Sequence, residues 1–515
     1  MLGKAGDMPR WVRNRVVASM LLSKGTTYIR LDERSAVEGA RQQVKYISTR
    51  GASPAVSFTE MLLTGLAPDG GLYLPQAYPH FTPDKINSLA GRPYTAVAQA
   101  ILSPFVAGEI EAAALDGLIK AAYAKFRHTA VTPLVQLDSD LVVLELFRGP
   151  TLAFKDLAMQ LLARFIDHVL KTRGERATIV GATSGDTGAA AIEAFAGLSQ
   201  VDVFILYPHG RVSEVQRRQM TTAEAGNIHT IALEGTFDDA QMCIKNMFNN
   251  RVLRDELSLC GVNSINFARI LFQTVYYFTS AMVLGAPHRP LSYVVPTGNF
   301  GDIFAGWMAK RMGLPIDRLA IATNSNDILA RTLASGCYAV ERVLATQSPS
   351  MDIQVSSNFE RLLFEVHGRD PVTLCGLMEG LRQSQRFTIA PGPLEAIRAE
   401  FDAFSVTEEE TTQAIADTWR DTGYLADPHT AVGLSAARKA RAKDSGYPCI
   451  VLGTAHPAKF PDAILRATGL QPKLPCHLAD LFERAECHSV LPNEQSTIEE
   501  FVRSRATRGS NSAAS

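Results

Sequence analysis

The chain has 515 residues, which suffices for roughly two to four domains and a sizeable buried core. Its 51 Lys and Arg residues nearly balance its 52 Asp and Glu residues, so it lacks the basic excess typical of proteins that bind nucleic acids or membrane surfaces. No apolar run approaches the roughly 18 residues of a membrane span. The seven cysteines are widely spaced and odd in number, which favours a reducing cytoplasm over a disulfide framework.

The two ends of the chain differ in composition from the rest. Residues 1–30 carry six basic side chains against one acid, and we expect residues 1–43 to form a flexible extension, with an organellar presequence as the alternative. The predicted divisions that follow are a small, more helical domain over residues 44–130, a first α/β region over 131–290, a second over 291–490 with a helical insertion, and a polar tail over 491–515. We expect Pro371, Pro391 and Pro393 to break the insertion into separate helices.

Short β-rich runs alternate with helical patterns from about residue 141. Strands are predicted at residues 141–146, 177–180, 201–207, 228–233, 291–295, 319–323 and 449–452. Helices are predicted at residues 156–171, between the loop 181–188 and Gly197, and at 213–221, 237–249, 267–284 and 302–312. Because parallel strands need crossover connections, this alternation predicts an α/β fold with mainly parallel sheets covered by helices on both faces. Ligands of such folds bind at the carboxyl ends of the strands, so we expect the chemistry in the strand-to-helix loops.

The first of these loops, residues 146–156, reads LFRGPTLAFKD and leads into a predicted helix. Lys155 should therefore lie near the positive end of that helix and beside apolar Leu152 and Phe154. Both features push a lysine toward its neutral, nucleophilic form, which imine formation with an aldehyde cofactor requires. Taken alone, this loop favours the ordinary alternative, a solvated surface lysine.

Two further loops have the composition of anion-binding turns. Residues 181–188 read GATSGDTG, and residues 297–302 read TGNFGD. Small residues allow backbone N–H groups to turn toward an anion at a helix start, and in the later loop Gly298 and Gly301 give that freedom. There Asn299 can add a side-chain hydrogen bond, and Asp302 can cap the helix. A plain turn without a ligand explains either loop about equally well. We expect all three loops at the same edge of one sheet, a combination that suits a phosphorylated aldehyde cofactor.

Five strings in one order resemble the threonine synthase family, a fold-type II pyridoxal-phosphate family of the tryptophan synthase β superfamily. They are FRGPTLAFKD, GATSGDTG, NSINFARI, PTGNFGD and GTAHPAKF, and the segments YISTRG and DGGLY precede them. The similarity extends from about residue 45 to about residue 491. One such string is weak support, whereas five in order are strong.

The resemblance implies roles for individual residues. Lys155 matches the lysine that forms a Schiff base with pyridoxal 5'-phosphate. Thr454 matches the residue that faces the pyridine nitrogen, and a hydroxyl there leaves that nitrogen largely unprotonated. His456 is expected to be a structural neighbour of the cofactor rather than a general acid or base. The residues that match the loop around the cofactor phosphate are Gly298, Asn299, Phe300 and Asp302.

The reaction implied by the resemblance converts O-phospho-L-homoserine and water into L-threonine and phosphate. Lys155 would be the base at Cα and later at Cβ, and no metal is expected. The dianionic leaving group calls for cationic partners, for which a guanidinium is well shaped. The candidate substrate-binding residues are Ser184, Asp186, Thr187, Arg50, Arg148, Arg269 and Arg361. For each arginine, a surface ion pair is the alternative.

Two other functions fit the same motifs. The first is a related enzyme that only eliminates phosphate and releases a 2-oxo acid. The second is a non-catalytic homologue that serves as a binding module, although the presence of Lys155, TGNFGD and Thr454 together argues against it. We expect a cytoplasmic monomer or homodimer that acts on a small molecule and not on a nucleic acid or a membrane.

Overall fold

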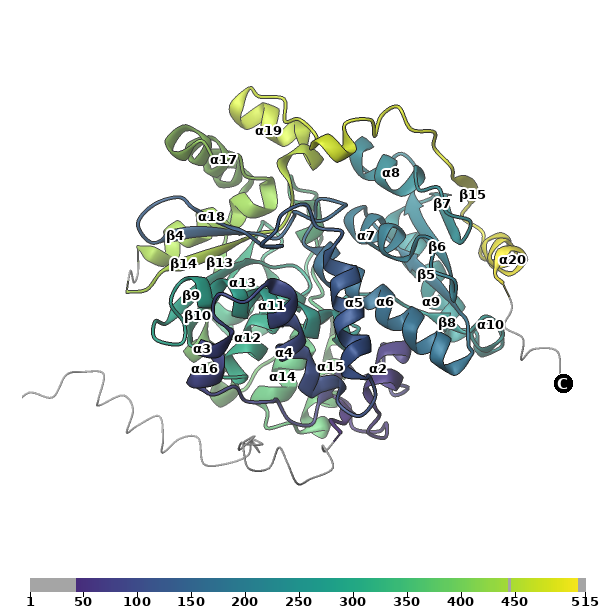
Figure 1. Ribbon diagram of the computed structural model, residues 1–515, viewed down its shortest axis with the longest axis horizontal. Coiled ribbons are helices and arrows are strands. Elements are labelled where there is room, and N and C mark those ends of the chain that lie inside the picture. The colour runs from purple at the N-terminus through teal and green to yellow at the C-terminus, as the bar shows by residue number, and fades with distance from the viewer. Residues whose placement is uncertain (1–42, 443–445, 508–515) are drawn as a thin grey trace, which may run out of the picture.

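Two sheets, each covered by helices on both faces, form the body of the protein in a computed structural model that describes residues 43–442 and 446–507 (Figure 1). The α/β fold class predicted from the sequence is confirmed. The extension expected over residues 1–43 lies, except for Gln43, outside the described residues. In the part of the chain that is described, no helix combines the length and apolar character needed to cross a membrane.

The first sheet has five parallel strands. In spatial order they are β15 (Ser489–Pro492), β7 (Ile228–Glu234), β6 (Val201–Pro208), β5 (Ala177–Ala182) and β8 (Leu259–Cys260). Side chains alternate between the two faces of a strand, and both faces of this sheet are apolar. One face packs on α9 (Phe237–Asn249), α10 (Arg251–Leu257) and α20 (Gln495–Arg505). The other face packs on α6 (Lys155–Arg173) and α7 (Asp186–Phe195), with α8 (Glu214–Thr221) beside α7.

The second sheet has six strands, and only its edge pair is antiparallel. In spatial order they are β13 (Phe401–Ser405), β10 (Ile316–Thr323), β9 (Leu291–Pro296), β14 (Cys449–Gly453), β4 (Leu141–Glu145) and β3 (Leu134–Gln136). One face packs on α18 (Pro428–Arg441), and the other on α11 (Phe267–Val283) and α12 (Gly301–Arg311). Helix α11 is buried on nearly all sides, as expected for a helix that is apolar all round.

The N-terminal region forms a small helical layer on the same core. Its elements are β1 (Tyr46–Ser48), α2 (Phe58–Thr64), β2 (Tyr73–Pro75), α3 (Pro83–Leu89), α4 (Tyr94–Val106) and α5 (Ala112–Tyr123). Helices α4 and α5 pack on α11 and α6, respectively, and share one hydrophobic cluster with them.

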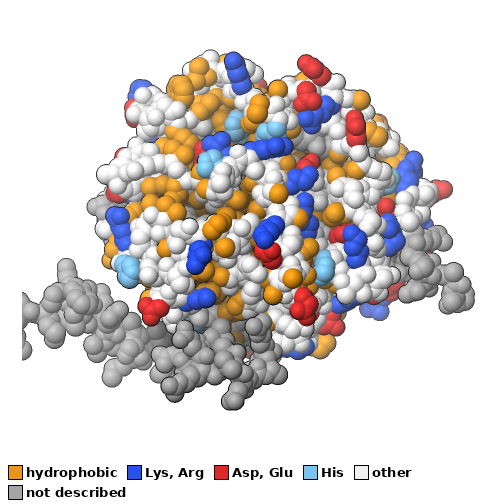
Figure 2. Space-filling model, viewed as in Figure 1, with side chains coloured by type: hydrophobic (Ala, Val, Ile, Leu, Met, Phe, Trp, Pro, Cys, Tyr) orange, Lys and Arg blue, Asp and Glu red, His pale blue; other side chains and the backbone are white. Residues whose placement is uncertain are grey.

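The remaining elements lie outside these two sheets. They are α13 (Ile328–Ser335), β11 (Cys337–Ala339), η1 (Pro349–Met351), α14 (Phe359–Val366), α15 (Pro371–Ser384), β12 (Arg386–Thr388), α16 (Pro391–Glu400), α17 (Glu408–Thr422), η2 (Pro457–Lys459), α19 (Pro461–Thr468) and η3 (Cys476–Leu478). Basic and acidic side chains are interspersed on the face shown in Figure 2.

Two expectations from the sequence are wrong, the single sheet for all three loops and the break at Pro393. The strand-to-helix loops belong to two sheets, because Lys155 and the 297–302 loop follow strands of the second sheet while the 181–188 loop follows β5 of the first. Pro371 and Pro391 begin α15 and α16 and so separate helices of the insertion as expected, whereas Pro393 marks no break, because it lies in the first turn of α16, where a proline costs no hydrogen bond. The described part of the polar tail, residues 491–507, is ordered on the first sheet, because β15 extends that sheet and α20 buries Ile498 and Val502 against it.

Candidate active site

Lys155 is the first residue of α6, directly after the loop that follows β4. Its side chain is 11% exposed, which rules out the solvated surface lysine, and Nζ lies 3.4 Å from Oδ2 of Asp186. The Phe154 ring covers the ammonium group, with Nζ 4.8 Å from the ring centroid. Burial lowers the pKa of Lys155 below its ordinary value, and the positive charges of Lys459 and Arg269 lower it further against the opposing effect of Asp186. Burial in an apolar setting therefore acts on this lysine as expected.

Thr454 lies beside Lys155 because the two loops are paired through their backbones. The N–H of Phe154 donates to the carbonyl oxygen of Thr454 at 2.8 Å, and Ala153 forms an antiparallel bridge with Ala455. Oγ1 of Thr454 is buried and has no hydrogen-bond partner among the described residues. A buried hydroxyl without a partner costs free energy unless a ligand satisfies it.

The loop 297–302 presents open backbone donors at the start of α12. Within the described part of the chain, the N–H groups of Gly298, Asn299 and Phe300 donate to no protein acceptor. The loop is held from behind, because the carbonyl oxygens of Gly298 and Asn299 accept hydrogen bonds from Ser356 and Asn358. Such a row of free N–H groups at a helix N-terminus is suited to a phosphate.

Two features of the 297–302 loop differ from the expectation: the position of its left-handed residue and the role of Asp302. The left-handed residue is Phe300, with φ of 63°, rather than either glycine. Its ring packs between those of Phe359 and Phe401 at 5.2 and 5.8 Å, and this packing offsets the strain of a non-glycine residue in that region. Asp302 does not cap α12, because its Oδ1 accepts hydrogen bonds from Tyr276 and Tyr277 in the interior.

The loop 181–188 supplies a carboxylate rather than an open anion cradle. The N–H groups of Gly185 and Gly188 donate to Oγ1 of Thr183, which closes part of the turn. Gly185 has φ of 142°, and a Cβ there would lie 2.5 Å from the Gln216 side chain, so this position requires glycine. The chain then enters α7 with Asp186 buried. Of the other two predicted residues, Ser184 is exposed and Thr187 is half-buried.

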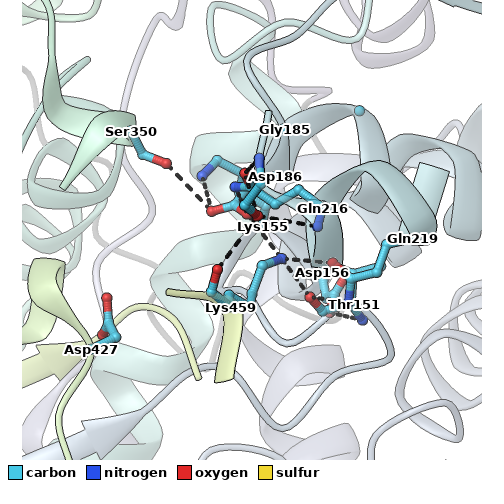
Figure 3. A network of polar contacts seen from close by, with 12 residues as sticks. Thr151, Lys155, Asp156, Gly185, Asp186, Gln216, Gln219, Ser350, Asp427 and Lys459 are labelled. Carbon is cyan, nitrogen blue, oxygen red and sulfur yellow. Dashed lines mark hydrogen bonds and ion pairs between the residues drawn. The ribbon is translucent and has the colours of Figure 1, made fainter. Parts of the chain in front are cut away.

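Asp186 is the centre of the polar network in Figure 3. Its Oδ1 lies 2.9 Å from Nζ of Lys459 and accepts a hydrogen bond from Gln216 at 2.9 Å. Its Oδ2 faces Lys155 and accepts a hydrogen bond from Oγ of Ser350 at 3.3 Å. Burial alone would raise the pKa of Asp186, but Lys459, Lys155 and Gln216 outweigh it and hold that pKa below its ordinary value.

Sequence reasoning missed Lys459, Gln216 and Ser350. Lys459 lies in the quoted string GTAHPAKF, and an apolar setting around a lysine was the signal available there. Gln216 and Ser350 had no local signal. Ser350 joins the network to the 297–302 loop. Its carbonyl oxygen lies so close to Gly298 that a Cβ added to that glycine would be 3.1 Å from it.

The four candidate arginines lie in different surroundings. Arg269, at the start of α11, is buried near Lys155, and its Nε has no hydrogen-bond partner among the described residues. Arg148 is 40% exposed and pairs with Glu145. Arg50 pairs with Glu360 of α14. Arg361 is fully buried, and its donors are taken by Tyr73, Ile265 and Asn358.

His456 has a structural role in this geometry. Its Nδ1 accepts the N–H of Ala458 and so caps the short helix η2, and its ring packs edge-on against Phe147. Burial, reinforced by the charge of Arg148, lowers the pKa of His456 to about 4. The imidazole is therefore neutral at neutral pH.

These residues fit pyridoxal phosphate. A buried lysine with a lowered pKa can bond to the aldehyde carbon, the unpartnered hydroxyl of Thr454 can meet a ring nitrogen, and the open N–H groups of the 297–302 loop can bind a phosphate. Contacts through Asp186 and Ser350 link the lysine to that loop, so the three features serve one site.

Three family models match the chain in order, and the second and third overlap over residues 430–452. The model described as "Threonine synthase N terminus" matches residues 45–123. The model described as "Pyridoxal-phosphate dependent enzyme" matches residues 125–452, and "Threonine synthase, C-terminal" matches residues 430–502.

Individual relatives agree with these models. A threonine synthase of Pseudomonas aeruginosa is 51% identical over 467 residues, which cover 90% of this chain and 99% of the relative. The structure of a PLP-bound threonine synthase from Brucella melitensis superposes with a TM-score of 0.88 at 59% identity and covers 90% of this chain and 99% of that one. The yeast threonine synthase structure gives a TM-score of 0.86 at 39% identity, covering 91% and 99%.

Proposed function

The chain belongs to the threonine synthase family of pyridoxal-phosphate-dependent lyases, and on this premise we propose that it converts O-phospho-L-homoserine and water into L-threonine and phosphate with Lys155 as the catalytic residue. The observation that carries the proposal is the burial of the Lys155 amine against Asp186, beside Thr454 and the 297–302 loop. Such a lysine is costly to keep inside a protein and is typical of a functional site.

We assign the cofactor contacts as follows. Lys155 would hold the aldehyde carbon, and Oγ1 of Thr454 would face the ring nitrogen. The N–H groups of Gly298, Asn299 and Phe300 would bind the cofactor phosphate. Asp302 does not contact the cofactor in this assignment. It supports the loop by accepting hydrogen bonds from the hydroxyl groups of Tyr276 and Tyr277 in the interior. When bound, pyridoxal phosphate supplies a conjugated ring that takes up electrons from the carbon next to the substrate amine.

Lys155 is also the residue that moves protons. Its free Nζ would be the base for Cα and later for Cβ, and the two protons would return to Cγ, which becomes a methyl group, and to Cα. Phosphate would leave from Cγ with the remaining proton of the water molecule whose hydroxyl adds at Cβ. Its lowered pKa suits this work, because a base must be neutral at the working pH. Ser184, in the loop before α7, and Thr187, in its first turn, are proposed to contact the substrate.

Arg269 is our choice among the arginines for the substrate phosphate. Its buried guanidinium has a free Nε donor close to Lys155, whereas Arg50 and Arg148 are paired with carboxylates and Arg361 has its donors satisfied. A guanidinium can bind a phosphate through two parallel hydrogen bonds.

We further propose that the protein works in the cytoplasm as a monomer or homodimer on this small molecule. The seven free cysteines support a reducing compartment. The interspersed charges on the face in Figure 2 give no support for a polyanionic partner.

The assay uses purified protein, pyridoxal phosphate and O-phospho-L-homoserine. Phosphate released with an equal amount of L-threonine supports the proposal. Phosphate released with 2-oxobutyrate would indicate the eliminating enzyme instead. A Lys155→Ala variant should release neither product.

A further inference from the structure

Lys459 is a second lysine at the centre of the site, and it is more deeply buried than Lys155. Its side chain is 0% exposed, and its Nζ donates to the Thr151 carbonyl at 2.7 Å and to Oε1 of Gln219 at 3.0 Å, besides the ion pair with Asp186 at 2.9 Å. An ammonium group has three donors, and all three are used (Figure 3). Lys459 therefore has no donor left for a substrate or a cofactor.

The charges at the centre do not balance when both lysines are protonated. Among the described residues, Asp186 is the one carboxylate that both ammonium groups contact, and it holds Lys459 at 2.9 Å but Lys155 at 3.4 Å. A buried cluster is least costly when it is neutral overall, so one lysine should give up its proton. Lys155 is the more weakly held of the two, because its ammonium group has one polar contact at hydrogen-bond distance where Lys459 has three.

We propose that Lys459 is a positioning residue that keeps the Lys155 amine neutral by occupying the Asp186 carboxylate. This inference rests on the proposed role of Lys155. Lys459 acts through Asp186 and through its own charge, and it also ties the Lys155 loop at Thr151 to α8 at Gln219.

The other charged groups nearby do not replace it. Arg269 on α11 adds positive charge and favours the neutral amine as well. Asp156 on α6 accepts two hydrogen bonds from Thr151, and burial raises the pKa of its carboxyl to about 7. Asp156 is thus only partly ionised near neutral pH, and both its oxygens accept from Thr151 rather than from either ammonium group, so it offsets part of the charge of Lys459 and does not take the place of Asp186. His456 is neutral there.

The test measures the titration of Lys155 in cofactor-free protein. An amine-directed acylating reagent is applied across a pH series, and the modified Lys155 peptide is quantified by mass spectrometry. Lys459→Met removes the charge, and we expect the midpoint of Lys155 labelling to move to higher pH by about one unit. Lys459→Arg keeps the charge and should follow the wild type. Lys310→Met is the matched control, because Lys310 is a partly buried lysine paired with Glu400 on another part of the fold.

A merely structural role for Lys459 would not move this midpoint. A Lys459→Met profile that coincides with the wild type, or an equal shift in Lys459→Arg or Lys310→Met, would overturn the proposal. If Lys459→Met does not fold, Lys459→Gln gives the same comparison with hydrogen-bonding capacity retained. The rate at which added pyridoxal phosphate acquires its visible absorbance should show the same shift. If the wild type develops no absorbance that Lys155→Ala lacks, the proposed function fails, while the labelling result still decides the role of Lys459.

Discussion

The backbone N–H of Phe154 donates a hydrogen bond of 2.8 Å to the carbonyl oxygen of Thr454. These two residues are 300 positions apart in the chain, yet this bond sets Lys155 and the Thr454 hydroxyl side by side at the ends of neighbouring strands β4 and β14. Since the backbone fixes that pairing, the Thr454 side chain is free for a ligand.

Thr454→Val tests this separation of roles. The buried hydroxyl has no partner among the described residues, so the cofactor-free variant should unfold at a temperature equal to or slightly above that of the wild type. Its dissociation constant for pyridoxal phosphate should rise on the order of fivefold, the value of one hydrogen bond. Absorbance titration measures this. Thr430→Val is the control, because Thr430 bonds to Asp427 and to the N–H of Thr454, and its loss should lower stability. Unchanged cofactor affinity in Thr454→Val would contradict the assignment.

Arg269→Met tests the choice among the arginines. The KM for O-phospho-L-homoserine should rise about tenfold to a hundredfold, because a charge-assisted hydrogen bond to the substrate phosphate is lost. Steady-state kinetics with phosphate detection measures it. Arg361→Met should instead lower the unfolding temperature, since it leaves the buried carbonyl oxygens of Tyr73 and Ile265 without donors. A wild-type KM in Arg269→Met would exclude that arginine.

Asp302→Asn tests the buried carboxyl behind the phosphate loop. Burial raises the pKa of Asp302 from 3.8 to about 6, so the folded protein binds this proton more tightly than the unfolded chain. The stabilisation is fully present below about pH 4 and is lost as the pH rises to about 6, a change of about 3 kcal/mol. Between about pH 4 and pH 6, the unfolding temperature of the cofactor-free wild type should therefore fall with rising pH more steeply than that of Asp302→Asn. Parallel curves would contradict the raised pKa.

Ile498→Ala tests the docking of α20 on the first sheet. Ile498 is fully buried, so the substitution should cost about 2 to 4 kcal/mol of unfolding free energy while cofactor affinity stays unchanged. Val490→Ala, at a largely exposed position of β15, should cost little. Denaturant unfolding compares the two. Equal stability of Ile498→Ala and the wild type would mean that the C-terminal helix does not pack there.

The sequence was most informative where local patterns decide the structure. The six strands and six helices predicted between residues 141 and 323, and the strand predicted at 449–452, are all present with ends within three residues, because apolar periodicity follows directly from side-chain spacing. The strand order could not be predicted, because periodicity does not say which strands pair, and the loops were therefore placed at one sheet instead of two.

The same limit applies to the site. Lys155 and Thr454 could be found because they lie in motifs. Lys459 was missed because its role depends on contacts with Asp186, Thr151 and Gln219, which no local pattern reveals. Short strands such as β8 and β15 were missed because they carry too few residues to show a period.

The central claim is that Lys155 is the residue that carries pyridoxal phosphate. Incubating the protein with the cofactor, reducing with borohydride and mapping the peptides by mass spectrometry tests this directly. We predict one stable phosphopyridoxyl group, on Lys155, which is lost in Lys155→Ala. A group attached to Lys459 or to another lysine in the wild type would contradict the account.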